Sequence, residues 1–179
     1  MNFIFNLVPL ILAMESTLLL NHEQIQQKIN RMAYQLFENN YNDSEIILAG
    51  IEQRGYVLAQ RIKTVLEGFS EQKVTLLSIE VEKDSPYQTF QQKEIAPEIY
   101  ENKVVVVIDD VLNSGKTLIY GVNQFLHAPV KKISTLVLID RNHKRFPVNA
   151  DYVGLSLATT LKQNIRVVFS DNGDEAFLE

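Results

Sequence analysis

Cysteine is absent from the 179 residues of this sequence, and only three histidines are present, at positions 22, 127 and 143. Without cysteine the chain has no disulfide, no thiolate zinc site and no cysteine nucleophile. Three histidines also leave little material for a metal site with nitrogen ligands. This composition is typical of a protein of the reducing cytoplasm, where we expect it to be located.

Positive charge is also scarce. Lys and Arg number 17 against 22 Asp and Glu, so the formal net charge is −5. A chain with this charge balance has no overall positive field for non-specific binding of nucleic acid. Only a local basic patch could bind nucleic acid.

The N-terminal apolar stretch, residues 3–13, is too short to span a bilayer, which takes about 20 apolar residues. It has no Lys or Arg before it, so the pattern does not favour a signal peptide, and we expect no membrane partner. We expect residues 1–15 to be an apolar extension and residues 16–179 to form one domain. The extension either packs on the domain as a first strand or helix, or precedes a true start near Met14.

With 46% apolar residues the chain can bury a substantial core. Short continuous apolar runs, typical of strands buried on both faces, alternate with segments in which apolar residues recur at helical spacing. Asn21 is placed to cap the first of these predicted helices. The predicted strands are 45–51, 73–81, 103–109, 133–140, 151–157 and 165–169; the predicted helices are 23–40, 55–66 and 115–126; a long loop covers 82–98. This alternation predicts an α/β fold with a central, mostly parallel sheet flanked by helices.

Two adjacent acids, Asp109 and Asp110, follow the valine-rich strand, and the turn Asn113–Thr117 then opens a helix. Ligands of an open parallel sheet bind beyond the carboxyl ends of its strands. The N–H groups and hydroxyls of such a turn suit a phosphate, and the two carboxylates can accept hydrogen bonds from the vicinal hydroxyls of a sugar. A nucleotide-triphosphate P-loop does not fit, because it needs glycine where Asp110 stands. The alternative is an acid pair that only caps a turn.

The stretch Val104–Thr117, VVVVIDDVLNSGKT, resembles the phosphoribosyl-pyrophosphate (PRPP) signature of the type I phosphoribosyltransferases. The resemblance implies that Asp109 and Asp110 bind the ribose hydroxyls of PRPP. It also implies Mg²⁺ as a cofactor that arrives with PRPP and meets these acids through the ligand or water. The 5′-phosphate would then be held by Asn113, Ser114, Gly115, Lys116 and Thr117.

Two more segments carry the resemblance. Residues 47–55 are similar to the family's pyrophosphate loop, in which Arg54 would face the departing pyrophosphate. Residues 138–145 and 150–154 are similar to the base-site and hood segments of one branch, the bifunctional pyrimidine-operon attenuation regulator and uracil phosphoribosyltransferase. The resemblance covers residues 16–170 and implies a small hood and a flexible loop over 82–96. The pyrophosphate loop would comprise Glu52, Gln53, Arg54 and Gly55, and the base site Ile139, Asp140 and Arg141.

The chain departs from this branch at three places. Glu52 stands where a basic residue is usual, the loop over 82–96 has no arginine, and the segment 156–160 lacks the proline and lysine expected of a hood. Glu52 would then point to solvent or contact metal-bound water.

These residues predict an Mg²⁺-dependent enzyme that transfers phosphoribosyl from PRPP to a pyrimidine base, most readily uracil, giving UMP and pyrophosphate. The reaction passes through a ribosyl cation-like state, so catalysis consists of positioning, charge neutralisation and exclusion of water. We expect Asp109, Asp110 and Arg54 to act in catalysis. Asp140 is a candidate general base, with a strand-end cap as the alternative.

Two other functions stay open. The first is a nucleotide-sensing regulator that binds an mRNA leader through Lys144 and Arg145. These two residues belong to a basic cluster with Arg141 and His143, which Lys28 and Arg31 would extend. The second is a purine phosphoribosyltransferase, because base choice often rests on main-chain contacts. In every case the family resemblance implies a homodimer or higher homo-oligomer.

Overall fold

The computed structural model describes residues 16–81, 95–160 and 163–179. Within these ranges, five strands form a parallel sheet in the order β3-β2-β4-β5-β6, and three strands form a second, antiparallel sheet in the order β1-β8-β7. In chain order the elements are β1 (Thr17–Leu20), α1 (His22–Glu38), β2 (Glu45–Ile51), α2 (Arg54–Phe69), β3 (Lys73–Ile79), α3 (Pro97–Tyr100), β4 (Val104–Leu112), α4 (Lys116–Asn123), β5 (Lys132–Asp140), β6 (Tyr152–Ser156), β7 (Ile165–Val168) and β8 (Glu175–Leu178).

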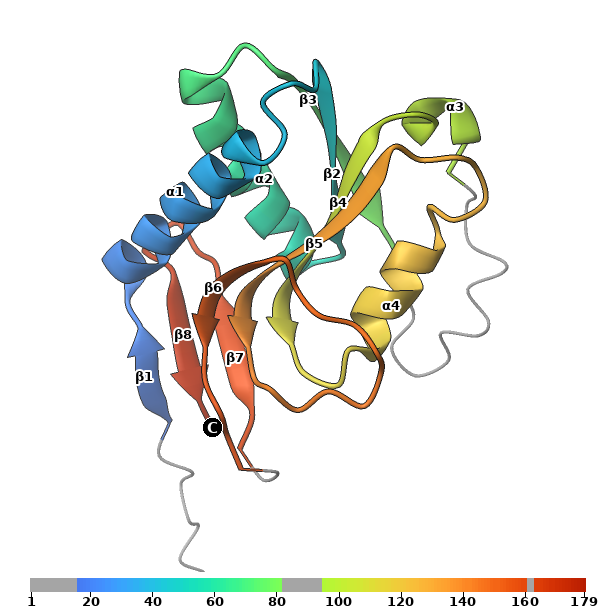
Figure 1. Ribbon diagram of the computed structural model, residues 1–179. Coiled ribbons are helices and arrows are strands. Elements are labelled where there is room, and N and C mark those ends of the chain that lie inside the picture. Colours follow the sequence, from blue (N-terminus) through green and yellow to red (C-terminus); the bar gives the residue numbers. More distant parts are fainter. Residues whose placement is uncertain (1–15, 82–94, 161–162) are drawn as a thin grey trace, which may run out of the picture.

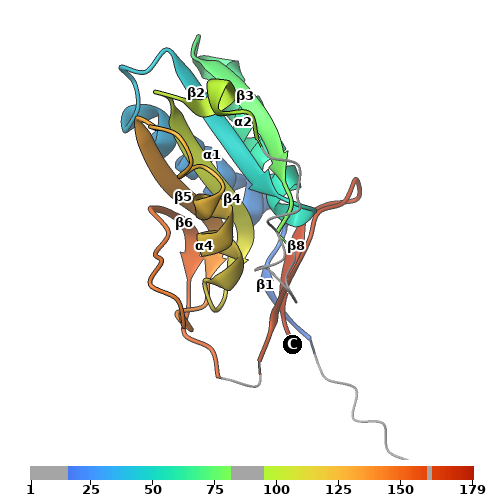
Figure 2. The same ribbon diagram turned by 90° about the vertical axis from the view of Figure 1, so that its right-hand side faces the viewer.

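The predicted α/β architecture is confirmed (Figures 1 and 2). Strand β4 lies at the centre of the parallel sheet, and its residues 104–108 are almost completely buried. Alternate side chains of a strand point to opposite faces. Accordingly, Val104, Val106 and Ile108 pack in the core beneath α1 and α2, whereas Val105 and Val107 pack in the core on the side of α3 and α4. Helices therefore cover both faces of the sheet, which is why the valine run is apolar without interruption.

Helix α1 begins where the sequence predicts. The Asn21 side chain accepts a hydrogen bond from the Gln24 main-chain N–H at 2.9 Å, and the Gln24 side chain accepts one from the Asn21 N–H at 3.0 Å. This reciprocal capping box satisfies two N–H groups that the helix itself leaves unpaired. The apolar stripe of the helix is fully buried and consists of Ile25, Ile29, Met32, Ala33 and Leu36.

The first residue of β2, Glu45, joins the starts of three neighbouring strands. Its carboxylate accepts a hydrogen bond from Thr75 at 2.9 Å and forms ion pairs with Lys73 at 3.1 Å and Lys103 at 3.3 Å. Burial acts to raise the pKa of Glu45, but the hydrogen bonds from Thr75, Lys73 and Lys103 together hold that pKa below its ordinary value.

The antiparallel sheet forms the hood, and the strands that build it differ from those predicted from the sequence. Residues 150–154 and 156–160 were expected to contribute to a hood, but β6 is the edge strand of the main sheet, with Leu136 paired to Tyr152. The hood is instead built from β1, β8 and β7, and Figure 1 shows it beside the carboxyl ends of the main strands. β1 and β8 come from opposite ends of the domain, so neither carries a local signal of its partner.

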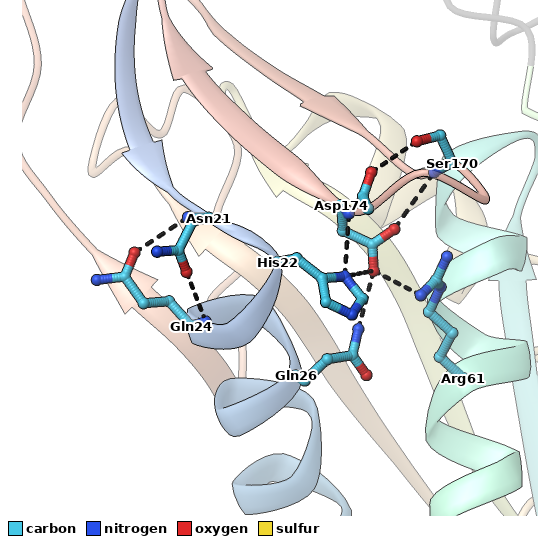
Figure 3. Close-up of polar contacts among 8 residues, drawn as sticks. Asn21, His22, Gln24, Gln26, Arg61, Ser170 and Asp174 are labelled. Atoms are coloured by element: carbon cyan, nitrogen blue, oxygen red, sulfur yellow. Dashed lines mark hydrogen bonds and ion pairs between the residues drawn. The ribbon is translucent and has the colours of Figure 1, made fainter.

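A buried carboxylate fastens the hood to the two helices (Figure 3). Asp174 precedes β8 and has no exposed surface. Its Oδ2 accepts hydrogen bonds from Arg61 of α2 at 2.5 Å and Gln26 of α1 at 2.8 Å, and its Oδ1 accepts one from the Ser170 N–H at 3.3 Å. The Asp174 N–H donates to His22 Nδ1 at 3.1 Å. Because buried charges need several partners, this network fixes the position of the hood.

Two predictions concern residues that lie outside those the structure describes: the apolar extension 1–15, and the flexible loop, of which 82–94 are not described. In the part of the chain that is described, none of the helices has the length and apolar character needed to cross a membrane.

Candidate functional site

The two adjacent acids lie at the carboxyl end of the main sheet, as predicted, but inside strand β4 rather than after it. β4 continues to Leu112 and pairs with β5 throughout, whereas its last pair with β2 joins Ile108 to Gly50. Asp109 and Asp110 therefore stand just past the end of β2, where one side of β4 is left open. Being consecutive in a strand, they point to opposite faces.

Both carboxylates are nearly buried, with 7% of Asp109 and 6% of Asp110 exposed, and both line a cavity of about 210 Å³. Asp109 Oδ1 accepts a hydrogen bond from the Asp110 N–H at 2.9 Å. Asp110 Oδ2 forms an ion pair with Arg54 Nε at 3.0 Å. The acids are thus placed at the cavity and are not merely caps of the following turn.

The turn after β4 ends at Gly115, a position whose backbone conformation and close surroundings require glycine. Gly115 has φ of 83° and immediately precedes α4, and a Cβ built on it would lie 2.6 Å from Val148 Cγ1. Left-handed φ and the missing side chain both require glycine here. The N–H groups at the start of α4 are oriented with the positive end of the helix dipole, a geometry that suits an anion. Asn113, Ser114, Gly115 and Thr117 line the cavity.

Residues that follow β5 stabilise this turn through hydrogen bonds. The main-chain N–H groups of Arg145 and Phe146 donate to the Ser114 carbonyl at 2.8 and 3.1 Å. Arg141 Nη1 donates to Asn113 Oδ1 at 3.0 Å. The turn is therefore positioned before any ligand arrives.

The loop between β2 and α2 depends on two glycines at which helix and sheet approach closely. A Cβ on Gly50 would lie 2.5 Å from Tyr56 Cα, and one on Gly55 would lie 2.5 Å from the Ile108 carbonyl oxygen. The close approach brings Arg54, the first residue of α2, to Asp110. Arg54 Nη1 also donates to the Val167 carbonyl of the hood at 3.3 Å.

Glu52 is one of the two residues of this loop, and it does not line the cavity. The peptide bond from Glu52 to Gln53 is cis. The Glu52 side chain is exposed and accepts a hydrogen bond from Ser78 Oγ at 3.2 Å, and its N–H donates to the Ile79 carbonyl at 3.0 Å. Of the two roles expected for Glu52, this placement favours the solvent-facing one.

A phosphoribosyl transferase domain model matches residues 16–171 of this chain, a range that contains the two acids, the glycine turn and the arginine loop. The chain belongs to the phosphoribosyltransferase family.

Individual relatives agree with this assignment. The protein is 32% identical to Bifunctional protein PyrR of Macrococcus caseolyticus, with 90% of this chain and 97% of that protein covered. It is 33% identical to the protein of the same name from Clostridium acetobutylicum, with 83% and 88% covered.

Among solved structures, hypoxanthine phosphoribosyltransferase of Trypanosoma cruzi is similar with a TM-score of 0.69 at 18% identity, covering 91% of each chain. The hypoxanthine-guanine enzyme of Bacillus anthracis is similar with a TM-score of 0.68 at 22% identity, covering 83% of this chain and 86% of that chain. These likenesses show that the fold is that of the type I phosphoribosyltransferases.

Most of the predicted PRPP-binding residues of this phosphoribosyltransferase meet at one cavity. The lining includes Arg54, the two acids, four residues of the turn and Arg141. The predicted PRPP, pyrophosphate-loop and base-site residues outside the lining are Glu52, Gln53, Gly55, Lys116, Ile139 and Asp140, and the predicted RNA-contact residues Lys144 and Arg145 also lie outside it.

Two of the predicted base-site residues have other roles in the structure. Ile139 is fully buried in the core, so its side chain cannot meet a base. Asp140 Oδ1 accepts from the Asn142 N–H at 2.8 Å, and Oδ2 pairs with Lys144 Nζ at 3.0 Å. These contacts are those of the strand-end cap, so the general-base role considered for Asp140 is not supported by its position.

Two cavity residues that the sequence did not reveal, Asn164 and Ile165, come from the hood. They lie at the start of β7, where the Asn164 N–H donates to the Glu179 carbonyl at 2.6 Å and the Glu179 N–H donates to the Asn164 carbonyl at 2.8 Å. No local motif marks them, because their position depends on pairing with the last residues of the chain.

Members of the predicted basic cluster differ in exposure, because Arg31 and Arg145 are exposed whereas Arg141 is buried. Arg141 is 4% exposed, and burial lowers the pKa of its guanidinium, which stays charged at neutral pH. Lys144 is paired with Asp140, and Arg31 donates to the Val153 and Gly154 carbonyls at 2.7 and 2.9 Å.

Proposed function

We propose that this phosphoribosyltransferase transfers the phosphoribosyl group of PRPP to uracil and releases UMP and pyrophosphate. The observation that carries the proposal is the meeting of Asp109, Asp110, Arg54 and the glycine turn at one cavity. The names of the curated relatives, which are bifunctional PyrR proteins, favour a pyrimidine base.

In this proposal each group has one task. Asp109 and Asp110 accept hydrogen bonds from the ribose hydroxyls, and the turn 113–117 binds the 5′-phosphate through its N–H groups. Arg54 exchanges its ion pair with Asp110 for the pyrophosphate, whose negative charge grows as the bond to C1 breaks. Fixed charges placed before the reaction stabilise such a change strongly, because they need little reorganisation.

The donor set at the cavity fits Mg²⁺. The ion prefers oxygen ligands and keeps several waters, so two carboxylates and the oxygens of PRPP form a suitable environment. Asp109 and Asp110 would hold it, directly or through water. When bound, Mg²⁺ supplies neutralisation of the pyrophosphate charge.

Pyrophosphate release tests the proposal. The purified chain is given PRPP and Mg²⁺ with uracil, hypoxanthine, guanine, adenine or orotate in separate reactions. We expect release with uracil, and a loss of about 10²-fold or more in Asp110→Asn, as for removal of one preorganised group that stabilises charge. Asp171→Asn, at an exposed position, is the control with the same charge change. No release with any base would contradict the proposal, and release with a purine alone would show a purine enzyme.

An RNA-binding regulator is the alternative from another class, and the side-chain contacts do not favour it. Three of the cations that would form its surface are already engaged: Arg141 is buried, Lys144 pairs with Asp140, and Arg31 binds main-chain carbonyls. We therefore propose that RNA binding through this cluster is weak. The measurement is the slope of log affinity against log salt for a structured pyrimidine-gene leader, with Lys144→Ala and Arg145→Ala; a steep slope that shrinks in both variants would favour the regulator.

Two further expectations belong to the proposal. The lack of cysteine supports location in the cytoplasm, where the enzyme would salvage pyrimidines. Family membership supports a homodimer or larger homo-oligomer, which sedimentation of the full chain tests.

A further inference from the structure

Arg141 is a buried cation in the wall of the cavity. It directly follows β5, and its N–H donates to the Leu112 carbonyl at 3.0 Å, so the main chain is fixed beside the end of β4. Only 4% of the residue is exposed, yet it lines the cavity. Among the described residues it forms no ion pair with a carboxylate, and all its hydrogen-bond acceptors are neutral.

These acceptors belong to two different parts of the fold. Nη1 donates to Asn113 Oδ1 of the turn at 3.0 Å and to Asn164 Oδ1 at 3.5 Å, at the entry to the hood. Nε donates to Thr159 Oγ1 at 3.0 Å, and Nη2 donates to the Thr160 carbonyl at 3.3 Å and to the Gln163 carbonyl. One rigid guanidinium therefore joins the turn after β4 to the segment that leads from β6 into β7.

The contacts to the two asparagines decide which way their amides face. A side-chain amide has one acceptor oxygen and one NH₂ group with two donors, so binding the oxygen to a cation leaves the NH₂ for other partners. Among the described residues, neither Asn113 nor Asn164 uses its NH₂ group in a hydrogen bond to the cavity wall. Both line the cavity, Asn113 next to Ser114 and Gly115 of the turn.

We propose that Arg141 is a positioning residue that turns the amides of Asn113 and Asn164 so that both present NH₂ donors to the ligand. The Asn113 NH₂ meets the 5′-phosphate, and the Asn164 NH₂ meets a carbonyl oxygen of the nucleobase. Asn164 is thus a specificity residue for bases that carry an oxo group. This assignment rests on the proposed function, because it takes the cavity as the site of a nucleoside monophosphate.

Asn164 is well placed for this task. Its main chain is held on both sides by Glu179, and β7 and β8 are held in turn by the buried Asp174 network. The main chain that carries the amide is therefore ordered before a base arrives, which lowers the cost of binding. A donor at this place discriminates against an amino group, since two donors facing each other would leave both unpaired.

The test compares two ligands that share the phosphate but differ in the base. Ribose 5-phosphate and UMP are titrated calorimetrically into the full chain and into Asn113→Asp and Asn164→Asp, which keep the side-chain shape but replace NH₂ by an oxygen. Asn113→Asp should weaken both ligands about tenfold or more, because a hydrogen bond to a charged group is lost. Asn164→Asp should weaken UMP about tenfold and leave ribose 5-phosphate within about twofold. Asn30→Asp, at an exposed position on α1, adds the same charge as a control.

Arg141 variants separate orientation from charge. Arg141→Lys keeps the charge but lacks the planar fork that holds both amides, so we expect it to weaken UMP about as much as Arg141→Gln. Full affinity in Arg141→Lys would overturn the positioning role. If either arginine variant fails to fold, the asparagine variants carry the test.

The outcomes distinguish this inference from the proposed function. Equal weakening of both ligands in Asn164→Asp, or unchanged affinity in Asn113→Asp, would overturn the inference while wild-type binding of UMP still supports the function. Wild-type protein that binds neither ligand would overturn both.

Discussion

The ion pair between Arg54 and Asp110 makes a prediction that separates binding from turnover. In the proposed function both partners leave this pair when PRPP binds, because Asp110 accepts a ribose hydroxyl and Arg54 meets the pyrophosphate. The product UMP carries no pyrophosphate, so it requires Asp110 but gains nothing from Arg54. Arg54→Ala should therefore lower turnover with PRPP without lowering the affinity for UMP.

The magnitude follows from exposure. The Arg54 side chain is 43% exposed, so its pair with Asp110 is screened by water and contributes about 0.2–1 kcal/mol. Removing the pair frees Asp110, and UMP should bind equally well or up to about fivefold more tightly. On the leaving pyrophosphate, in contrast, one lost donor to a developing charge costs about 10²–10³-fold in turnover.

Calorimetry with UMP and a pyrophosphate-release assay with PRPP and uracil measure the two effects on the same protein. Arg54→Lys is the matched variant, which keeps the charge and should retain part of the turnover. A tenfold loss of UMP affinity in Arg54→Ala, or turnover equal to wild type, would refute this reasoning.

Three further variants test the frame of the site. Gly115→Ala places a side chain at φ of 83° and 2.6 Å from Val148 Cγ1, so denaturant titration should show about 2–5 kcal/mol lower stability; a loss below about 0.5 kcal/mol would be inconsistent with the turn geometry. Glu45→Gln should lower the free energy of unfolding at pH 7. The ionised Glu45 stabilises the fold above the ordinary pKa of glutamate, so the difference in unfolding free energy between wild type and variant should vanish as pH falls through the lowered pKa of Glu45. A difference that grows in acid would contradict this account. Asp174→Asn removes the buried partner of Arg61, which should lower stability by up to about 3 kcal/mol and speed hydrogen exchange of the hood; unchanged hood exchange would show that this carboxylate does not anchor it.

The main sheet could be predicted from sequence because its signals are local. Five apolar residues at 104–108 show that β4 is covered on both faces, and Asn21 with Gln24 marks the start of α1. The hood could not be predicted in the same way. Its strands β1 and β8 have four residues each and pair across almost the whole domain, so only the folded chain brings them together.

The positions of the acids and of the glycine turn were predictable for a related reason. They lie at and just after the end of one strand within a single short motif, and a strand end fixes where such residues lie. Arg141 shows the limit of this reasoning: its place in a basic stretch indicated exposure, whereas it is buried and bonded to Thr159, Thr160, Gln163 and Asn164. Asp140 shows the same limit, because its partners Asn142 and Lys144 determine whether its carboxylate is free to act.

A crystal structure with bound UMP and Mg²⁺ tests the central claim most directly. We predict the ribose hydroxyls within hydrogen-bond distance of the Asp109 and Asp110 carboxylates and the phosphate on the N–H groups of residues 113–117. Nucleotide bound elsewhere, or in this cavity with its phosphate away from that turn, would contradict the account.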